Sequence, residues 1–355
     1  MKRRISTSDI WADCCAALTS YDGGMTVEQL LNDGWQFCKL PLGSTLEDVS
    51  NAALQAVDLP HDFLIENEND LYETTDAWYL RTLDVPESWC ASCVLVRFDG
   101  VYMDCDVLLN GHIVCTHHYG YTAFDVDLTS RLLVGRNTLA VHIRHQSPNS
   151  RWYSGAGIYR DVTLHVLPKR HIPLDGVYVT TTHELESWTM TIDTELCGVK
   201  DNGVLTHVLL DGDVPVCDVT VEAAGDHANA VMQVLSPKLW SPDAPNVYTL
   251  QTMLGNQVIR QNVGFRDLTF TTDCGLLVNG APVKLHGVCL HHDLGCLGSA
   301  FHEKAMRRQL RAMRQMGVNA LRTSHNPPAK QVMDLCDELG IFVVDEAFDM
   351  WLRAK

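Results

Sequence analysis

One stretch, residues 319–346, constrains the fold more than any other part of the sequence. Residues 319–328 predict a short strand followed by a polar turn, residues 329–339 a helix, and residues 341–344 a second strand. The helix is predicted from apolar residues spaced along one helical face, and Gly340 suits its C-terminal cap because glycine adopts a left-handed backbone without a Cβ penalty. The second strand is apolar throughout, as is typical of a parallel strand covered on both faces. The stretch therefore predicts one β-α-β unit of a parallel sheet.

Polar residues follow both strands of this unit, at or just beyond their C-terminal ends. They are Arg322, Ser324, His325, Asp345, Glu346 and Asp349. In a closed barrel of β/α units, this end of the strands is where active-site residues are found. The unit is therefore a candidate for part of an active-site face.

The same stretch resembles the first signature of glycoside hydrolase family 2, which includes β-galactosidases, β-glucuronidases and β-mannosidases. The matching positions are Asn319, Leu321, Arg322, two small residues, His325, Pro327, Val332, Met333, Asp337, Gly340 and the four apolar residues that follow it. The one departure is Asn326, where the family usually has tyrosine. A generic β-α-β unit would explain the apolar positions but not the sequence Arg-Thr-Ser-His.

Two β regions are predicted before the parallel sheet. Residues 1–24 show no periodicity and are interpreted as an N-terminal tail. Residues 25–168 contain many short strand-like segments and a hairpin signal at Asn110-Gly111, where a type I′ turn needs positive φ at both positions. They predict a sandwich or jelly roll, and they resemble the family's jelly-roll sugar-binding domain. Residues 169–266 alternate in a second β pattern that predicts an immunoglobulin-like β-sandwich.

Residues 267–355 alternate strands with helices and predict the start of a (β/α)8 TIM barrel. Residues 285–293 predict its first strand and loop, and residues 303–316 its first helix. Only three barrel strands are predicted, whereas a closed barrel needs eight. The barrel is therefore expected to be truncated, and the chain is expected to be the N-terminal part of a longer enzyme or a truncated gene product.

Composition limits the partners of the chain. The formal net charge of −17 argues against nucleic acid and against anionic membranes, since both attract basic patches. No apolar run of about 18 residues is present, so no membrane-spanning segment is expected. Met1-Lys-Arg-Arg4 is not followed by an apolar core, so no signal peptide is expected. The 13 cysteines favour buried thiols and a cytoplasmic location over a disulfide framework. Cys90 and Cys93 have the spacing of a zinc site, but the second pair of cysteines that such a site needs is not found at a suitable distance.

The resemblance implies a sugar pocket at the C-terminal ends of the barrel strands. The substrate-binding residues expected from it are Asp62, Asn149, Arg151, Trp152, His291, His292, His325 and Asp349, with Trp351 at the rim. Imidazole donates to and accepts from sugar hydroxyls, and tryptophan packs on apolar sugar faces. Structural alternatives stay open: histidines bonded to neighbouring carboxylates, Asp62 capping a turn, and Trp152 packed in a core. Arg322 is expected to pair with Glu346 inside the barrel rather than to bind sugar.

The implied activity is the retaining hydrolysis of terminal non-reducing β-D-galactosides, because residues 59–63 and 150–160 resemble galactosidase-type members more than glucuronidases. A β-glucuronidase, a β-mannosidase and a non-catalytic carbohydrate-binding fragment are the alternatives. Retention usually needs two carboxyl groups about 5–5.5 Å apart, which the family supplies as glutamates on later barrel strands. No Asn-Glu pair follows Glu346, so both glutamates are expected after Lys355, and this chain alone is expected to be inactive.

The expected partner is therefore a carbohydrate substrate, and no cofactor or metal is assigned to this chain. Some relatives bind magnesium through a carboxylate near this point of the barrel. Asp349 and Met350 do not clearly reproduce that ligand, so magnesium or sodium in a full-length enzyme stays open. A homo-oligomer of the full-length form and the physiological substrate stay open as well.

Overall fold

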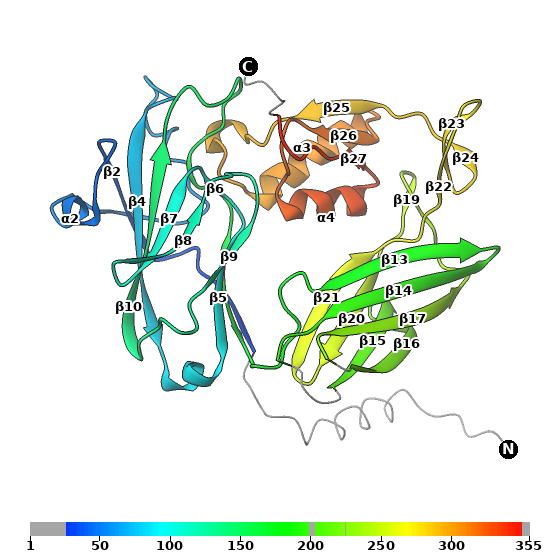
Figure 1. Ribbon diagram of the computed structural model, residues 1–355. Coiled ribbons are helices and arrows are strands. Elements are labelled where there is room, and N and C mark those ends of the chain that lie inside the picture. The colour runs from blue at the N-terminus through cyan, green and yellow to red at the C-terminus, as the bar shows by residue number, and fades with distance from the viewer. Residues whose placement is uncertain (1–25, 199–202, 224, 350–355) are drawn as a thin grey trace. The chain divides into compact units, whose positions relative to one another are not determined.

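The computed structural model describes residues 26–198, 203–223 and 225–349, which form two compact units (Figure 1). One unit holds the described residues of Val27–Val166, Leu239–Asn246 and Arg266–Lys355. The other unit holds those of Leu167–Lys238 and Val247–Phe265. The predicted tail of residues 1–24 lies outside the described residues, and so does Trp351.

The jelly-roll region, residues 27–167, is built from antiparallel strands in two main sheets. The four-stranded sheet has the order β1-β12-β5-β9 and comprises β1 (Val27–Leu30), β5 (Cys93–Phe98), β9 (Phe124–Asp127) and β12 (Val162–Leu167). The six-stranded sheet has the order β3-β2-β4-β10-β7-β8 and comprises β2 (Trp35–Leu40), β3 (Gln55–Val57), β4 (Thr75–Val85), β7 (Cys105–Leu109), β8 (His112–His117) and β10 (Gly135–His145). The remaining elements are the pair β6 (Val101–Tyr102) and β11 (Gly157–Ile158), the helix α2 (Leu46–Val49) and the 3-10 helix η2 (Glu87–Ala91).

Most buried apolar residues of this region form one main core, and a smaller cluster contains Cys38, Val49, Trp78, Leu108 and Ala140. Five large side chains of the main core are each at most 1% exposed, namely Trp35, Phe63, Tyr79, Phe98 and Tyr159. Removing a large apolar side chain from water contributes about 1.5–3 kcal/mol, so this core accounts for the main stabilisation of the region. Asn110 and Gly111 join β7 to β8 with φ values of 51° and 82°, which confirms the predicted hairpin.

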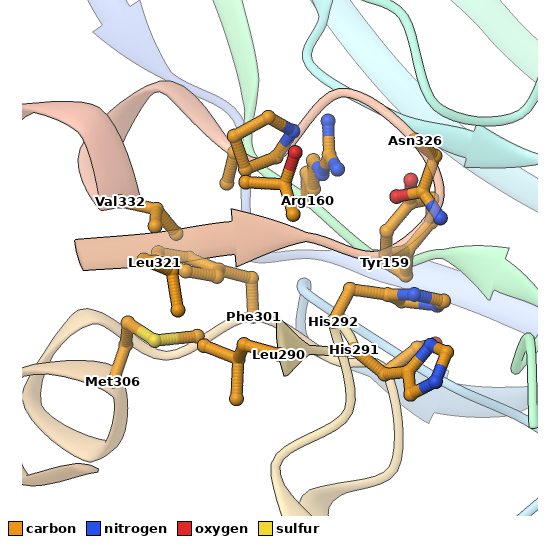
Figure 2. A pocket seen from close by; sticks show the side chains of 14 residues that line it. Tyr159, Arg160, Leu290, His291, His292, Phe301, Met306, Leu321, Asn326 and Val332 are labelled. Atoms are coloured by element: carbon orange, nitrogen blue, oxygen red, sulfur yellow. The ribbon is translucent and has the colours of Figure 1, made fainter. Parts of the chain in front are cut away.

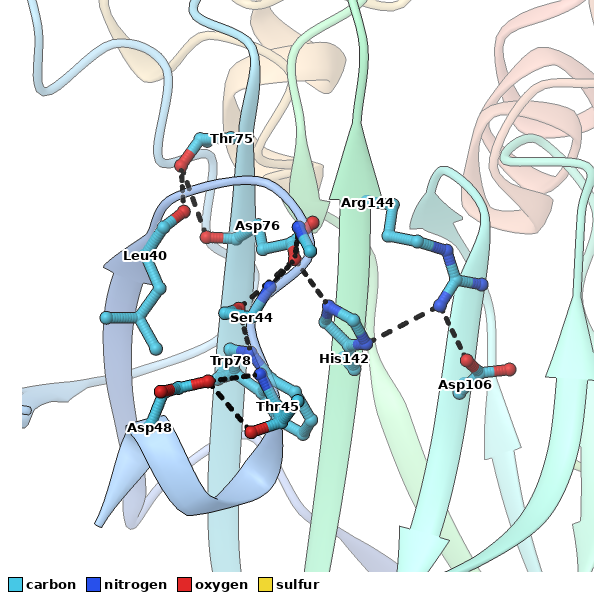
Figure 3. Close-up of polar contacts among 11 residues, drawn as sticks. Leu40, Ser44, Thr45, Asp48, Thr75, Asp76, Trp78, Asp106, His142 and Arg144 are labelled. Atoms are coloured by element: carbon cyan, nitrogen blue, oxygen red, sulfur yellow. Dashed lines mark hydrogen bonds and ion pairs between the residues drawn. The ribbon is translucent and has the colours of Figure 1, made fainter. Parts of the chain in front are cut away.

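A buried polar cluster on the six-stranded sheet fastens the loop that precedes α2 (Figure 3). Oδ2 of Asp76 accepts hydrogen bonds from the backbone N–H groups of Gly43 (2.8 Å) and Ser44 (2.9 Å). Nε2 of His142 lies 3.1 Å from the same oxygen. Burial lowers the pKa of His142 and outweighs the raising effect of Asp76. At neutral pH the loop is therefore held by hydrogen bonds to a carboxylate rather than by a charged histidine.

The sandwich unit contains two antiparallel sheets. The three-stranded sheet β13-β14-β17 comprises β13 (Val177–Glu184), β14 (Ser187–Glu195) and β17 (His227–Leu235). The four-stranded sheet β16-β15-β20-β21 comprises β15 (Gly203–Asp211), β16 (Val214–Ala223), β20 (Tyr248–Leu254) and β21 (Gln257–Val263). Alternate residues point inward and give a core that includes Ile172, Leu196, Leu205, Ala228 and Leu254. This is the alternation expected of a β-sandwich.

The barrel region, residues 266–349, contains the predicted parallel sheet. Its strands are β25 (Gly287–Leu290), β26 (Ala320–Thr323) and β27 (Phe342–Val344), paired in that order and all parallel. Its helices are α3 (Glu303–Gln315), α4 (Lys330–Leu339) and the 3-10 helix η3 (Gly295–Leu297). An antiparallel meander precedes them, made of β22 (Leu268–Thr271), β23 (Gly275–Val278) and β24 (Ala281–Pro282). The predicted alternation of strands and helices is confirmed.

A short segment, Leu239–Asn246, belongs with the barrel region although the chain places it between sandwich strands. It forms the pair β18 (Trp240–Ser241) and β19 (Ala244–Pro245). The Nε1–H of Trp240 donates to the carbonyl oxygen of Asp337 in α4 at 2.8 Å. Gly340 caps α4 with a φ of 70°, and a Cβ there would overlap the carbonyl oxygen of Pro242. Glycine is thus required at position 340 by both the cap and this contact.

Among the described residues, no helix is long and apolar enough to cross a membrane. The described cysteines are all free thiols. No group of three or more histidine, cysteine, aspartate or glutamate side chains that could hold a metal ion occurs in the part of the chain that the structure describes.

Candidate functional site

Three loops leave the parallel strands of the barrel region at their C-terminal ends. His291 and His292 follow β25, His325 follows β26, and Glu346 and Asp349 follow β27. Because the three strands are parallel and adjacent, these ends meet at one edge of the sheet. The fold therefore brings the barrel residues predicted from the sequence to one edge, here called the C-terminal edge.

The jelly-roll region contributes Trp152 to this edge. The indole ring stacks on the imidazole of His291, with centroids 5.5 Å apart and planes at 25°. It meets the imidazole of His325 edge-on at 5.3 Å, and the two imidazoles are 5.7 Å apart. One indole and two imidazoles, here called the aromatic cluster, offer a flat apolar surface beside ring nitrogens. This combination suits a sugar ring, which has an apolar face and hydroxyl groups at its rim.

An ion-pair cluster holds His325 in place. Nε of Arg322 donates to Oε1 of Glu346 at 2.7 Å, and Oε2 of Glu346 lies 2.8 Å from Nδ1 of His325. Burial raises the pKa of Glu346, but the hydrogen bonds from Arg322 and His325 outweigh burial and leave the pKa below its ordinary value. Nη2 of Arg322 also lies 3.2 Å from Nδ1, but the ionised carboxylate is the stronger acceptor. The predicted pairing of Arg322 with Glu346 is confirmed.

The protonation of His325 follows from this geometry. An ionised carboxylate only accepts hydrogen bonds, so Nδ1 of His325 holds a proton that it donates to Glu346. In the neutral imidazole, Nε2 is then an unprotonated acceptor. His325 can thus accept from a ligand hydroxyl, and it can donate from Nε2 after taking up a second proton.

The imidazole of His292 is bonded to the jelly-roll region. Its Nε2–H donates to the carbonyl oxygen of Ser154 at 2.8 Å. Burial lowers the pKa of His292 to about 4, so the ring is neutral at pH 7. His292 lines a cavity of about 20 Å³ together with Tyr159, Arg160 and Asn326 (Figure 2), which has room for one water-sized molecule. Nδ1 of His292 and Nδ2 of Asn326 have no hydrogen-bond partner among the described residues.

Two predicted jelly-roll residues are bonded to protein. Asp62 is 1% exposed, and the donors to its two oxygens are Leu64 N, Ala156 N, Tyr153 OH, Ser299 N and Ser299 Oγ. This departs from the sugar contact that the sequence predicted, because the buried carboxylate is enclosed by donors from three parts of the chain. Asn149 donates to the carbonyl oxygen of Gln146 at 3.0 Å and accepts from the hydroxyl of Tyr102 at 3.2 Å.

Arg151 and Asp349 pair at the outer side of the edge. Nη2 of Arg151 lies 2.7 Å from Oδ2 of Asp349, and the arginine side chain is 57% exposed. The pair connects the loop that contains Trp152 to the loop that follows β27. The sugar contacts expected of Arg151 and Asp349 stay predictions.

Sequence reasoning missed the residues that fasten the jelly-roll region to the three barrel loops. After β25, Ser299 donates to Asp62. After β26, the carbonyl oxygen of Pro327 accepts from Nη2 of Arg160 at 2.9 Å. After β27, the carbonyl oxygen of Ala347 accepts from the hydroxyl of Tyr119 at 2.7 Å. These partners are far apart in the sequence and two of the acceptors are backbone atoms, so no local pattern indicates them.

Three family models match the chain in the order of its regions. They are "Glycosyl hydrolases family 2, sugar binding domain" over residues 24–168, "Glycosyl hydrolases family 2" over residues 171–266, and "Glycosyl hydrolases family 2, TIM barrel domain" over residues 271–350. The chain belongs to glycoside hydrolase family 2. It contains the family's sugar-binding domain, its immunoglobulin-like domain and part of its TIM barrel, which confirms the predicted fold class.

Among its relatives, the beta-galactosidase BoGH2A of Bacteroides ovatus is 36% identical over 336 residues, which are 85% of this chain and 38% of that protein. A putative beta-glucuronidase of Formosa agariphila is 30% identical over 344 residues, 92% of this chain and 33% of that protein.

Solved structures agree with the fold. A glycosyl hydrolase family 2 member from Bacteroides cellulosilyticus superposes with a TM-score of 0.85 at 31% identity, over 91% of this chain and 48% of the other. Bacteroides uniformis beta-glucuronidase 2, covalently bound to cyclophellitol-6-carboxylate aziridine, superposes with a TM-score of 0.79 at 27% identity, over 91% of this chain and 42% of the other. The chain thus spans less than half the length of these proteins.

Proposed function

We propose that this chain supplies part of the terminal-sugar pocket of a retaining exo-β-glycosidase that hydrolyses non-reducing β-D-galactosides. The observation that supports the proposal best is the aromatic cluster of Trp152, His291 and His325, which lies where parallel barrel strands present functional groups. The 36% identity with the beta-galactosidase BoGH2A favours the galactoside.

The proposal assigns the acid/base and the nucleophile to glutamates outside this chain. Each carboxylate that follows β27 is already bonded to protein in this structure. Asp345 accepts from Thr323 at 3.0 Å, Glu346 pairs with Arg322 and His325, and Asp349 pairs with Arg151. The chain's own contribution would be to bind and orient the sugar, with Trp152 at its apolar face and Nε2 of His325 at a hydroxyl.

A β-glucuronidase of the same family is the second candidate, because relatives and solved structures with that name match the chain as well. A uronate substrate has a negative charge that needs a cation in the pocket. Arg151 is a cation next to Trp152, but Asp349 already neutralises it, and this favours a neutral sugar. The remaining alternatives are a β-mannosidase and a carbohydrate-binding product without catalysis.

The full-length protein should be assayed against nitrophenyl β-glycosides of galactose, glucuronic acid, mannose and glucose. The proposal expects the highest kcat/KM with the β-galactoside. A kcat/KM for the glucuronide or mannoside that exceeds it by about tenfold would reassign the substrate. For the chain itself, calorimetric titration with galactose should show binding that Trp152→Ala abolishes. His286→Ala, at the opposite end of β25 and exposed, is the matched control.

A further inference from the structure

Asp62 is a buried carboxylate that joins three separate parts of the chain. Its Oδ1 accepts from two backbone groups of the jelly-roll region, the N–H of Leu64 and the N–H of Ala156, both at 3.1 Å. Its Oδ2 accepts from the hydroxyl of Tyr153 at 2.7 Å and from Ser299, through N–H at 2.8 Å and Oγ at 3.0 Å. Ser299 lies in the loop that follows β25 and is itself 1% exposed.

The two loops that meet at this carboxylate have glycine where they approach it. A Cβ on Gly155 would lie 2.6 Å from Oδ2 of Asp62, and a Cβ on Gly298 would overlap the same oxygen. Both glycines have positive φ, +65° and +59°. The surroundings of Asp62 are thus shaped to admit a carboxylate, since any side chain at either glycine would displace it.

The same two loops supply two members of the aromatic cluster. Trp152 lies three residues before Gly155, and His291 lies at the start of the loop that reaches Gly298 and Ser299. Their rings stack at 5.5 Å although one comes from the jelly-roll region and the other from the barrel region. Asp62 is the group that bonds to both loops, through Tyr153 on one side and Ser299 on the other.

We propose that Asp62 is a positioning residue for the sugar pocket: its carboxylate fixes the loop of Trp152 against the loop of His291 and so sets the stacked geometry of the two rings. The inference replaces the direct sugar contact expected from the sequence. Its importance for catalysis rests on the proposed function, but the geometry that it predicts does not.

Both acceptor oxygens of the Asp62 carboxylate are needed. In Asp62→Asn the amide oxygen would stay with Leu64 and Ala156, because two backbone N–H groups cannot become acceptors. The amide nitrogen would then face Ser299 and Tyr153. Their hydroxyls can rotate to accept, but the N–H of Ser299 cannot, so the bond to that backbone group would be lost. Burial, with the charge of Asp62 adding to it, raises the pKa of Tyr153 and keeps the phenol a donor.

The test compares this chain with its Asp62→Asn variant by NMR of labelled histidine rings and by amide hydrogen exchange, with no sugar present. His291→Gln assigns the His291 signal, and Trp152→Phe gives its position without the indole ring current. We expect Asp62→Asn to move the His291 signal most of the way to its position in Trp152→Phe and to speed exchange at the Ser299 amide by about tenfold. Asp84→Asn, which removes an exposed carboxylate of β4, should change neither.

A His291 signal that stays at its wild-type position in folded Asp62→Asn overturns the proposal, whatever happens to stability. If Asp62→Asn fails to fold, Tyr153→Phe and Ser299→Ala each remove one hydroxyl donor and should move the signal in the same direction by a smaller amount; no movement in either also overturns it. Galactose titration of the wild-type chain is the separate test of the proposed function. If the ring signals move as expected but the wild-type chain does not bind galactose, the proposed function is refuted and the positioning role is kept.

Discussion

Nδ1 of His325 lies 2.8 Å from Oε2 of Glu346, so a carboxylate after one strand sets the tautomer of an imidazole after the neighbouring strand. Nε2 of the neutral ring is then unprotonated, so it can accept a hydrogen bond from a ligand hydroxyl. Glu346 would therefore influence a bound sugar through His325 without touching it.

His325→Ala in the full-length enzyme should lower kcat/KM by more than about tenfold, because a contact to the reacting sugar is used in the transition state. The free energy of unfolding should change by less than about 1 kcal/mol, since the side chain is partly exposed. Steady-state kinetics and urea unfolding check both values, with His286→Ala as the control. Near-normal kinetics would show that the histidine is structural.

The chain as given should hydrolyse no glycoside. Hydrolysis usually needs a carboxylic acid and a second carboxylate on opposite sides of one bond. The carboxylates after β27 are bonded to protein, and the proposed function assigns the catalytic pair to glutamates outside this chain. Chain purified from a host without β-galactosidase should release no nitrophenol from a β-galactoside above the buffer rate. Turnover that disappears in Glu346→Gln or Asp349→Asn would mean that the catalytic pair lies here after all.

Acid should destabilise the sandwich unit through His207. This residue is fully buried in β15, its Nδ1 lies 3.0 Å from Oγ1 of Thr252, and burial lowers its pKa to about 4 from an ordinary 6.5. As the pH falls from 6.5 towards 4, the unfolded chain binds a proton that the folded chain does not, so stability falls by about 3 kcal/mol across this window.

The measurement for His207 is urea unfolding at about pH 7 and about pH 5, followed by hydrogen exchange of the β15 amides. His207→Gln keeps a hydrogen-bonding group for Thr252 but does not titrate, and it should flatten the pH dependence. The exposed control His112→Gln should keep the wild-type slope. An unchanged slope in His207→Gln would assign the acid sensitivity to other groups.

The ion pair between Arg151 and Asp349 should contribute little to stability. The arginine side chain is 57% exposed, and exposed pairs usually contribute less than about 1 kcal/mol. A double-mutant cycle with Arg151→Ala and Asp349→Ala should give a coupling energy in that range that declines with salt. The less exposed pair of Arg144 and Asp106 should show a larger coupling. A value of about 3 kcal/mol or more for the first pair would contradict this expectation.

The boundary at Asp267 stays a proposal that proteolysis can test. Sandwich-like alternation ends near Phe265, and the compact units divide between Phe265 and Arg266. Limited proteolysis should therefore cut close to residue 266 and release fragments that unfold separately. Segment Leu239–Asn246 lies before this boundary in the sequence, although it belongs with the barrel region. Cuts only at other places, with residues 169–266 and the barrel region unfolding as one, would refute the boundary.

Local patterns predicted much of the fold. The apolar spacing of α4, the cap at Gly340 and the Asn110-Gly111 turn depend on neighbours within a few residues, and each is found where the sequence indicated. The meeting of His291 with His325 was also predictable, because adjacent parallel strands end at one edge. Partners of Asp62 were not predictable: Ser299 is brought to it only by the packing of one region on another.

The anchoring of the three barrel loops has a consequence for how such genes recombine. Each loop is fastened to the jelly-roll region by a different side chain, namely Asp62, Arg160 and Tyr119. A chimera that took its jelly-roll region from one relative and its barrel from another would combine barrel loops with jelly-roll side chains that had not evolved together. Even a crossover within the sandwich would separate the three jelly-roll side chains from the barrel loops to which they bond. The jelly-roll region and the barrel region should therefore be inherited together, because the three bonds tie one to the other.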